Sequence, residues 1–141
     1  MEQITQSEES MRELGKRLGS SFKGGEVVEL IGDVGAGKTT LTKGIAVGLG
    51  VTEDVQSPSF TLSRLYEGAN NIQLAHYDFY RLSDPGILAD ELVDTMGQAD
   101  TVTVIEWADI VEGVLPDERI TIHITSPSES ERHITMKGIS L

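Results

Sequence analysis

The sequence predicts a single α/β domain over residues 1–141, with a mixed parallel and antiparallel central sheet flanked by helices and a β-hairpin at its C-terminal end. Three observations favour this fold. Residues 26–50 suggest a β-rich strand, a glycine-rich turn and an amphipathic helix in succession. Residues 101–105 (TVTVI) are a second β-branched run, typical of a buried strand. Residues 120–125 (ITIHIT) alternate strictly between apolar and polar side chains, and residues 133–136 (HITM) form a second such segment after a turn, which predicts the hairpin.

The N-terminal part predicts a short extended segment and then a helix. Thr5 to Glu8 (TQSE) fits a capping box, and Met11, Leu14 and Leu18 make an apolar stripe at helical spacing. The next helix is expected to begin at about Lys38, after the glycine-rich turn.

Two further strands and a helix are expected in the middle of the chain. Residues 60–66 and 72–78 flank a turn at residues 67–71, and this spacing predicts an antiparallel hairpin. A helix should then open at residues 84–86 (DPG), with Asp84 at the cap position and Pro85 just inside.

The glycine-rich turn carries chemistry. Residues 32–39 (GDVGAGKT) match the P-loop pattern G-x-x-x-x-G-K-[ST] at every fixed position. Its glycines let the backbone aim several N–H groups at one phosphate chain, assisted by the following helix dipole. Lys38, expected to be exposed on the loop, reaches the β and γ phosphates, and the Thr39 hydroxyl can ligate Mg²⁺. An ordinary turn has no need of Gly-Lys-Thr at its end, so the sequence predicts a nucleoside-triphosphate-binding protein.

The composition limits the partners. Twenty-three acidic residues against eleven basic ones give a net charge of −12, and the basic residues are scattered. Tight nucleic-acid binding by the chain alone is therefore not expected, because phosphate backbones favour clustered Lys and Arg. Cysteine is absent, which excludes disulfides and thiolate metal sites. No apolar stretch is long enough for a membrane span, and the polar N-terminus does not resemble a signal peptide. We expect a cytoplasmic protein with no membrane partner.

A P-loop needs further anions to hold Mg²⁺ and to orient the attacking group. Glu106 is the first candidate because it directly follows the apolar strand 101–105, whose carboxyl end should face the phosphate cleft. A surface acid that merely ends a strand is the alternative. Asp78, which closes residues 74–77, is the second candidate, and a solvated turn aspartate competes with it.

Other candidates are weaker. Trp107, the single tryptophan, suits nucleotide stacking, a partner-facing anchor or plain core equally well. His76 has no second imidazole or cysteine at ligand spacing, so we reject a metal-ligand role for it. His123 and His133 should be solvated. Three hydroxyl residues could belong to a switch-like loop, and three arginines could stabilise charge: Ser57, Ser59 and Thr61, and Arg64, Arg81 and Arg132.

Four blocks of sequence resemble the TsaE family (older name YjeE), small bacterial ATPases of the tRNA threonylcarbamoyladenosine (t6A) pathway. They are residues 32–40 (GDVGAGKTT), 57–62 (SPSFTL), 76–82 (HYDFYRL) and 106–107 (EW). The blocks occur in the family's order and at family-like spacing, and the resemblance covers nearly the whole chain. Ser59 is a departure, because the family more often has threonine there, but the hydroxyl is kept.

The resemblance implies roles for individual residues. It implies that the ATP phosphates are bound by Gly35, Ala36, Gly37, Lys38, Thr39 and Thr40. It implies that Thr39 and Glu106 hold Mg²⁺ and that Lys38, Glu106 and Asp78 are catalytic. It suggests that Arg132 and the stretch before the first helix approach the nucleotide. The implied partners are TsaB and TsaD, the paired threonylcarbamoyl-transferase subunits.

Other functions remain open as alternatives. A GTPase is disfavoured because N-K-x-D is absent and the lone D-x-x-G, Asp94 to Gly97, lies in a helix-like stretch. A small-molecule kinase would need a lid with clustered arginines. A non-catalytic nucleotide-sensing module remains possible, and ATP turnover would distinguish it from an enzyme.

Overall fold

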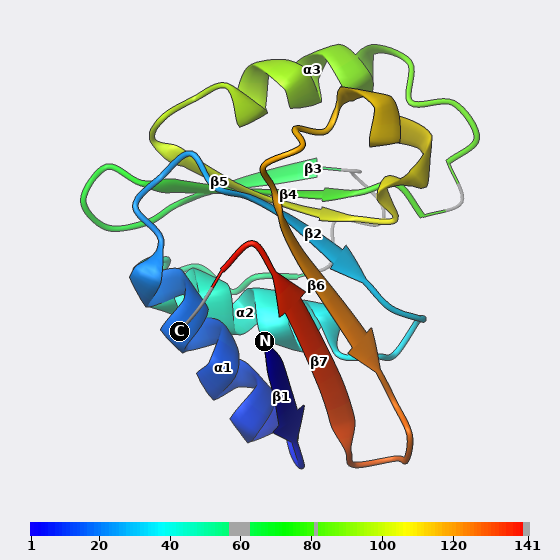
Figure 1. Ribbon diagram of the computed structural model, residues 1–141. Helices are drawn as coiled ribbons and strands as arrows, with labels where there is room; N and C mark the ends of the chain where they lie inside the picture. The colour runs from blue at the N-terminus through cyan, green and yellow to red at the C-terminus, as the bar shows by residue number, and fades with distance from the viewer. Residues whose placement is uncertain (57–62, 81, 140–141) are drawn as a thin grey trace.

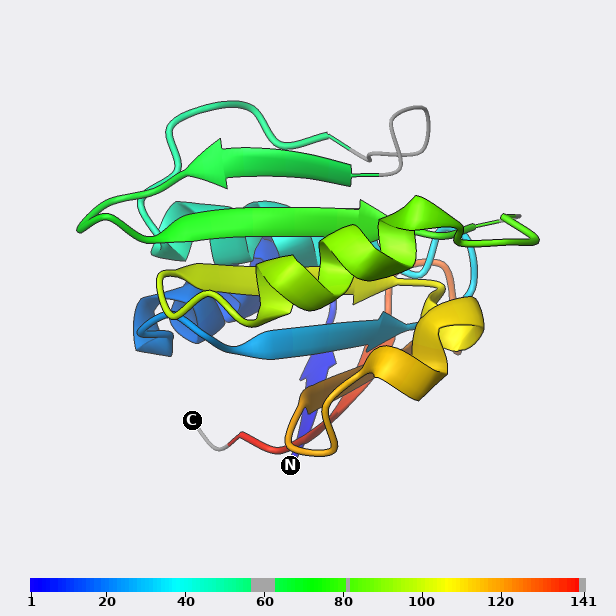
Figure 2. The same ribbon diagram turned by 90° about the horizontal axis from the view of Figure 1, so that it is seen from above.

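A seven-stranded sheet lies between two layers of helices in the computed structural model, which describes residues 1–56, 63–80 and 82–139 (Figure 1). In chain order the elements are β1 (Glu2–Thr5), α1 (Glu8–Ser21), β2 (Val27–Ile31), α2 (Lys38–Gly48), β3 (Ser63–Glu67), β4 (Gln73–Asp78), α3 (Ile87–Met96), β5 (Thr101–Glu106), the 3-10 helix η1 (Ala108–Val114), β6 (Ile120–Thr125) and β7 (Arg132–Lys137). Helices α1 and α2 cover one face of the sheet, and α3 and η1 cover the other, as the view from above confirms (Figure 2).

The sheet mixes the two pairing types, in the order β1-β7-β6-β2-β5-β4-β3. The central strands β6, β2, β5 and β4 run parallel, whereas β3, β7 and β1 pair antiparallel at the two sides. The predicted α/β class, the β3–β4 hairpin and the C-terminal β6–β7 hairpin are therefore confirmed. Because β2 and β5 are parallel neighbours, their carboxyl ends meet at one edge of the sheet, where the P-loop begins.

Alternating side chains divide the core between the two faces of the sheet. Strand β5 illustrates this, because Val102 and Val104 pack with α1 and α2 while Ile105 packs with residues of α3 and η1. The stripe predicted for the first helix, Met11, Leu14 and Leu18, is buried. The isoleucines and Met136 predicted to face inward on the last hairpin are buried as well.

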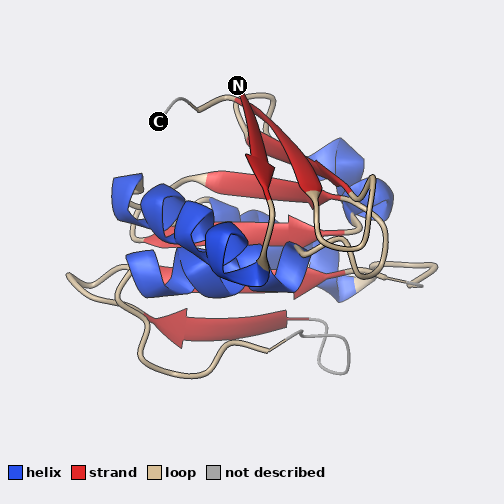
Figure 3. Cartoon of the chain, turned by 90° about the horizontal axis from the view of Figure 1, so that it is seen from below, coloured by secondary structure: helices blue, strands red, loops and turns tan. Residues whose placement is uncertain are grey.

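Helices α1 and α2 lie side by side at very close range (Figure 3). Both carry two glycines four residues apart, Gly15 and Gly19 on α1, and Gly44 and Gly48 on α2. A Cβ atom at Gly15 would lie 2.4 Å from the Leu41 carbonyl oxygen, and one at Gly44 would lie 2.2 Å from the Arg12 carbonyl oxygen. Only glycine permits this approach, which fixes α2, and hence the P-loop, against α1.

Three local predictions need correction or fall outside the description. The cap of α1 is Ser7, not Thr5, because the Ser10 amide donates to Ser7 Oγ at 3.0 Å and the Ser7 amide donates back to Ser10 Oγ. The cap of α3 is Gly86, and Asp84 instead accepts a hydrogen bond from the Gly86 amide within the preceding turn. Residues 60–62 of the expected strand lie outside the described residues.

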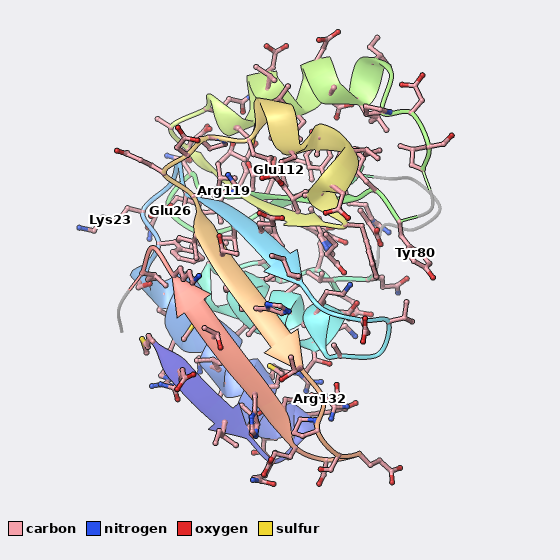
Figure 4. The ribbon with its side chains drawn as sticks, turned by 45° about the vertical axis from the view of Figure 1, so that its right-hand side comes forward. Lys23, Glu26, Tyr80, Glu112, Arg119 and Arg132 are labelled. Carbon is pink, nitrogen blue, oxygen red and sulfur yellow. The ribbon has the colours of Figure 1, made fainter. Side chains whose placement is uncertain are left out.

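An arginine just before the amino end of β6 fastens η1 to the sheet (Figure 4). Arg119 donates from Nε to the buried Glu29 of β2 at 2.9 Å and from Nη2 to Glu112 of η1 at 2.8 Å. The hydrogen bond with Glu29 raises the pKa of Arg119, so this link carries a permanent charge. Among the described helices, none is long and apolar enough to cross a membrane.

Candidate functional site

The loop between β2 and α2 has the backbone of an anion cradle. Gly35 and Gly37 have φ angles of +83° and +108°, which residues with a side chain rarely adopt. Gly37 is the N-cap of α2 and supplies no side chain to its first turn. The first N–H groups of α2 therefore point out of the helix without a capping side chain, at the positive end of the helix dipole. This arrangement suits a phosphate group.

Lys38 is not exposed, contrary to the expectation from the sequence; only 5% of it is accessible. Its ammonium group donates to the Gly32 carbonyl oxygen at 2.7 Å and lies 3.9 Å from Glu106 Oε1. It also lies 3.9 Å from the centroid of the Trp107 ring. Burial lowers the pKa of Lys38, although the nearby carboxylates of Glu106, Asp78 and Asp33 oppose that shift.

The two strand-end acids lie opposite each other. Asp78 of β4 is in register with Glu106 of β5, and both are buried, with 5% and 3% accessible. The alternatives of a solvated turn aspartate and of a surface acid are therefore wrong. Asp78 Oδ1 accepts a hydrogen bond from the Tyr80 amide at 2.9 Å, and the Glu106 carbonyl accepts one from the Phe79 amide at 3.1 Å.

Trp107 turns the chain back over the site. Its backbone is left-handed, with φ 55° and ψ 51°, a conformation that is strained for a bulky residue. The half-buried ring contacts Lys38 on one side, and Tyr80 lies 4.7 Å away between ring centroids. Such strain is typical of functional sites and is maintained here by the packing of η1 immediately after Trp107.

Arg132 joins two walls of the site. Its Nε donates to the Ala36 carbonyl oxygen of the P-loop at 3.0 Å. Its Nη1 lies 3.0 Å from three carbonyl oxygens of the hairpin loop, those of Ser128, Glu129 and Glu131. Of the other candidate arginines, Arg64 is an exposed residue that packs near the ring of Tyr66, and Arg81 lies outside the described residues.

One cavity of about 640 Å³ brings most of the predicted residues together. Its wall contains Gly35, Gly37, Lys38, Thr39, Thr40, Asp78, Glu106 and Arg132. The predicted stretch before the first helix also contributes, through Gln6 and Ser7. Ala36 is the exception, because it lines a second cavity of about 460 Å³, which shares Lys38 and Trp107 with the first. Tyr80 and Arg132 both lie at the edge of the sheet where β2 and β6 end (Figure 4).

The sequence did not single out several residues that line the cavity, nor the role of His76, which lies behind the cavity wall. Tyr80, Glu129 and Ser130 line the cavity, but only their place in the fold reveals this. His76 is fully buried, and its Nε2 lies 2.5 Å from Glu106 Oε2. The spacing His76-x-Asp78 offered a signal, because residues two apart on a strand face the same side of a sheet.

His123 and His133 are exposed, as expected. Ser57, Ser59 and Thr61 lie outside the described residues.

The donor set fits a magnesium ion that is shared with phosphates. Within residues 1–56, 63–80 and 82–139, no three His, Cys, Asp or Glu side chains form a cage for a metal. Mg²⁺ rarely needs one, because it keeps several waters and takes one or two carboxylates together with substrate phosphates. The Thr39 hydroxyl and the carboxylates of Glu106 and Asp78 offer suitable oxygens on one cavity wall.

Comparisons with known proteins agree on one family. The family model described as "Threonylcarbamoyl adenosine biosynthesis protein TsaE" matches residues 5–134. A Bacillus subtilis "tRNA threonylcarbamoyladenosine biosynthesis protein TsaE" is 38% identical over 96% of this chain and 84% of its own length. The Streptomyces coelicolor protein of the same name is 37% identical over 92% of this chain and 90% of its own length.

A solved structure extends the agreement to the fold. The crystal structure of YdiB from Bacillus subtilis superimposes with a TM-score of 0.79 and 39% identity, covering 96% of this chain and 83% of that one. The resemblance seen in the four sequence blocks is confirmed. This chain belongs to the TsaE family of threonylcarbamoyl adenosine biosynthesis proteins.

Proposed function

We propose that this protein binds ATP with Mg²⁺ beside the P-loop, hydrolyses it in the cytoplasm, and supports repeated tRNA N6-threonylcarbamoyladenosine modification by a TsaB–TsaD transferase pair. The observation that carries the nucleotide part is the single cavity that holds the P-loop residues Lys38 and Thr39 and the buried acids Asp78 and Glu106. Family membership supports the pathway part, since the names of the relatives refer to t6A biosynthesis.

Phosphate binding rests on residues 35–40. The uncapped amides at the start of α2 surround the phosphates, and Lys38 supplies a positive charge. To reach them, the Lys38 ammonium leaves its hydrogen bond with the Gly32 carbonyl and its place over Trp107. The Gly32 carbonyl oxygen is a neutral acceptor, whereas a phosphate oxygen is charged. A hydrogen bond from the Lys38 ammonium to phosphate is therefore the stronger of the two.

Turnover depends on the strand-end acids. Glu106 and Thr39 hold Mg²⁺, which when bound offsets negative charge on the phosphate oxygens. Asp78 lies beside Glu106, where it helps to orient the attacking water. Both carboxylates are buried, so their charges act with little screening by solvent.

Hydrolysis by the isolated chain should be slow. In the described part of the cavity wall, Arg132 is the one arginine. Its Nε and Nη1 already lie within hydrogen-bond distance of four main-chain carbonyl oxygens. An arginine finger supplied by a partner can raise turnover by about 10³–10⁵-fold. A partner that completes the site therefore fits a slow ATPase that acts within a larger complex.

The decisive experiment measures two rates with the cognate TsaB–TsaD pair. One is ATP hydrolysis by this protein with and without the pair, and the other is t6A formation over several turnovers with and without this protein. We expect the pair to stimulate hydrolysis and repeated modification to require the protein. A pair that does neither contradicts the pathway assignment, whereas ATP binding by the isolated chain tests the nucleotide site separately.

A further inference from the structure

His76 is the buried histidine of β4, and it contacts one carboxylate oxygen of the site. In the pairing of β4 with β5, His76 is opposite Val104 and Asp78 is opposite Glu106. His76 and Glu106 are therefore diagonal neighbours on the face of the sheet that α1 and α2 cover. None of the His76 side chain is accessible, and its Nε2 lies 2.5 Å from Glu106 Oε2.

The contacts determine which ring nitrogen carries the hydrogen. A carboxylate oxygen only accepts hydrogen bonds, so Nε2 of His76 is the donor to Glu106. His76 Nδ1 is buried and has no hydrogen-bond partner among the described residues. A hydrogen on Nδ1 would be an unsatisfied buried donor, which also favours the Nε2–H form.

The two oxygens of Glu106 therefore have different surroundings. Oε2 is held by His76 behind the cavity wall, whereas Oε1 lies 3.9 Å from the ammonium of Lys38. A glutamate has several rotatable bonds, and holding it in one conformation costs entropy. A hydrogen bond from a residue that is itself fully buried restricts that freedom.

We propose that His76 is a positioning residue, whose Nε2–H fixes the carboxylate of Glu106 so that Oε1 is presented to the nucleotide and its metal ion. This inference rests on the proposed ATPase function, and it assigns to His76 an effect on turnover through Glu106 rather than contact with the substrate. Hydrogen bonds that orient metal-binding carboxylates typically change activity or metal affinity by about 10–100-fold when removed.

Two amide substitutions separate this role from a general need for a polar core residue. The side-chain amide nitrogen of glutamine reaches about as far as His76 Nε2, whereas that of asparagine reaches only as far as Nδ1. We expect kcat for ATP hydrolysis to fall in His76→Asn, and His76→Gln to exceed His76→Asn by at least about tenfold. ADP affinity should change little in either variant, because neither alters the P-loop. Equal kcat values for the two folded variants would contradict the proposal.

Thr103→Val is a matched control. Thr103 is fully buried on the neighbouring strand β5, with a hydroxyl that has no partner among the described residues, and it lies outside the cavity wall. We expect its kcat to match that of the wild type. A loss as large as that of His76→Asn would show that any change in the buried sheet lowers kcat, and would overturn the specific role of His76.

A measurement on the unmodified protein makes the test independent of how the variants fold. Long-range ¹H–¹⁵N correlation NMR distinguishes the two ring nitrogens of a histidine, and we expect His76 to carry its hydrogen on Nε2. A hydrogen on Nδ1 alone overturns the inference. Absence of ATP turnover in the wild type, with and without the partner pair, would instead contradict the proposed function itself.

Discussion

The ammonium group of Lys38 lies 3.9 Å from the centroid of the Trp107 ring, and the same group donates to the Gly32 carbonyl. The P-loop lysine is thus held by groups of the protein itself. A cation over a tryptophan face contributes about 0.5–2 kcal/mol, and more as the site is desolvated. In the proposed function, the Lys38 ammonium leaves the Trp107 ring when it contacts the phosphates of a bound nucleotide. The surroundings of Trp107 therefore depend on whether the P-loop holds a nucleotide.

Tryptophan fluorescence should report that exchange, because Trp107 is the single tryptophan of the chain. We expect the emission of Trp107 to change on addition of ATP with Mg²⁺ and to saturate with the nucleotide concentration. Lys38→Met serves as the control, since it removes the ammonium from the ring. An unchanged spectrum at saturating nucleotide would show that Lys38 does not leave Trp107.

Replacing Lys38 should strongly reduce ATP hydrolysis without unfolding the protein. Methionine suits the test better than alanine, because Lys38 is 5% accessible and truncation to alanine would leave a void. We expect Lys38→Met to lower turnover by about 10²–10³-fold, as loss of one transition-state donor does. Its thermal midpoint should stay close to that of the wild type, because a buried cation whose pKa is lowered adds little stability. Hydrolysis at the wild-type rate would exclude the P-loop from the mechanism.

The two strand-end acids should differ in their effect. Glu106→Gln keeps the shape of the side chain but removes the charge that binds the metal, so turnover should fall by about 10²-fold or more. Asp78→Asn should be milder, at about tenfold, because the proposed role of Asp78 is to orient the attacking water and not to hold the metal. Glu118→Gln, an exposed acid outside both cavities, is the control. Negligible and equal changes at positions 78 and 106 would mean that both acids are structural.

The glycine contact between α1 and α2 predicts a large effect from a small substitution. Gly15→Ala places a Cβ 2.4 Å from the Leu41 carbonyl oxygen, so the helices must separate. We expect a loss of about 1–3 kcal/mol in the free energy of unfolding, measured by urea titration. Gly113→Ala is the matched control, because a Cβ added at Gly113 would have nothing within 4 Å of it. Similar stability for both variants would show that the interface tolerates the added methyl group.

The parts of the fold that local sequence determines were predictable. The P-loop, the strand before it and the start of α2 follow from residues 26–39, because glycine spacing and periodicity act over short distances. The apolar run of β5 likewise located Glu106 at a strand end. Alternation in β6 and β7 predicted the last hairpin.

The parts that depend on long-range packing were not predictable. The His76–Glu106 contact joins residues 30 apart in the sequence and depends on the register of two parallel strands. Arg132 and Ala36 are 96 residues apart, and only the fold brings the hairpin loop to the P-loop. The burial of Lys38 has the same origin, since Trp107 covers it from another strand end.

The charge of the chain supports a last prediction, on RNA. The net charge is −12, and the described part of the cavity wall carries four acidic side chains, Glu8, Asp78, Glu106 and Glu129, against the two basic ones of Lys38 and Arg132. A tRNA backbone gains affinity mainly by releasing counterions from phosphates paired with Lys and Arg, and this chain has only eleven such residues, scattered along the sequence. We therefore expect no tight complex between the isolated protein and tRNA at physiological salt in a gel-shift assay. With the transferase pair added, any shift should depend on the pair. A sub-micromolar complex of the isolated protein that weakens as salt rises would overturn the charge argument and assign RNA binding to this chain.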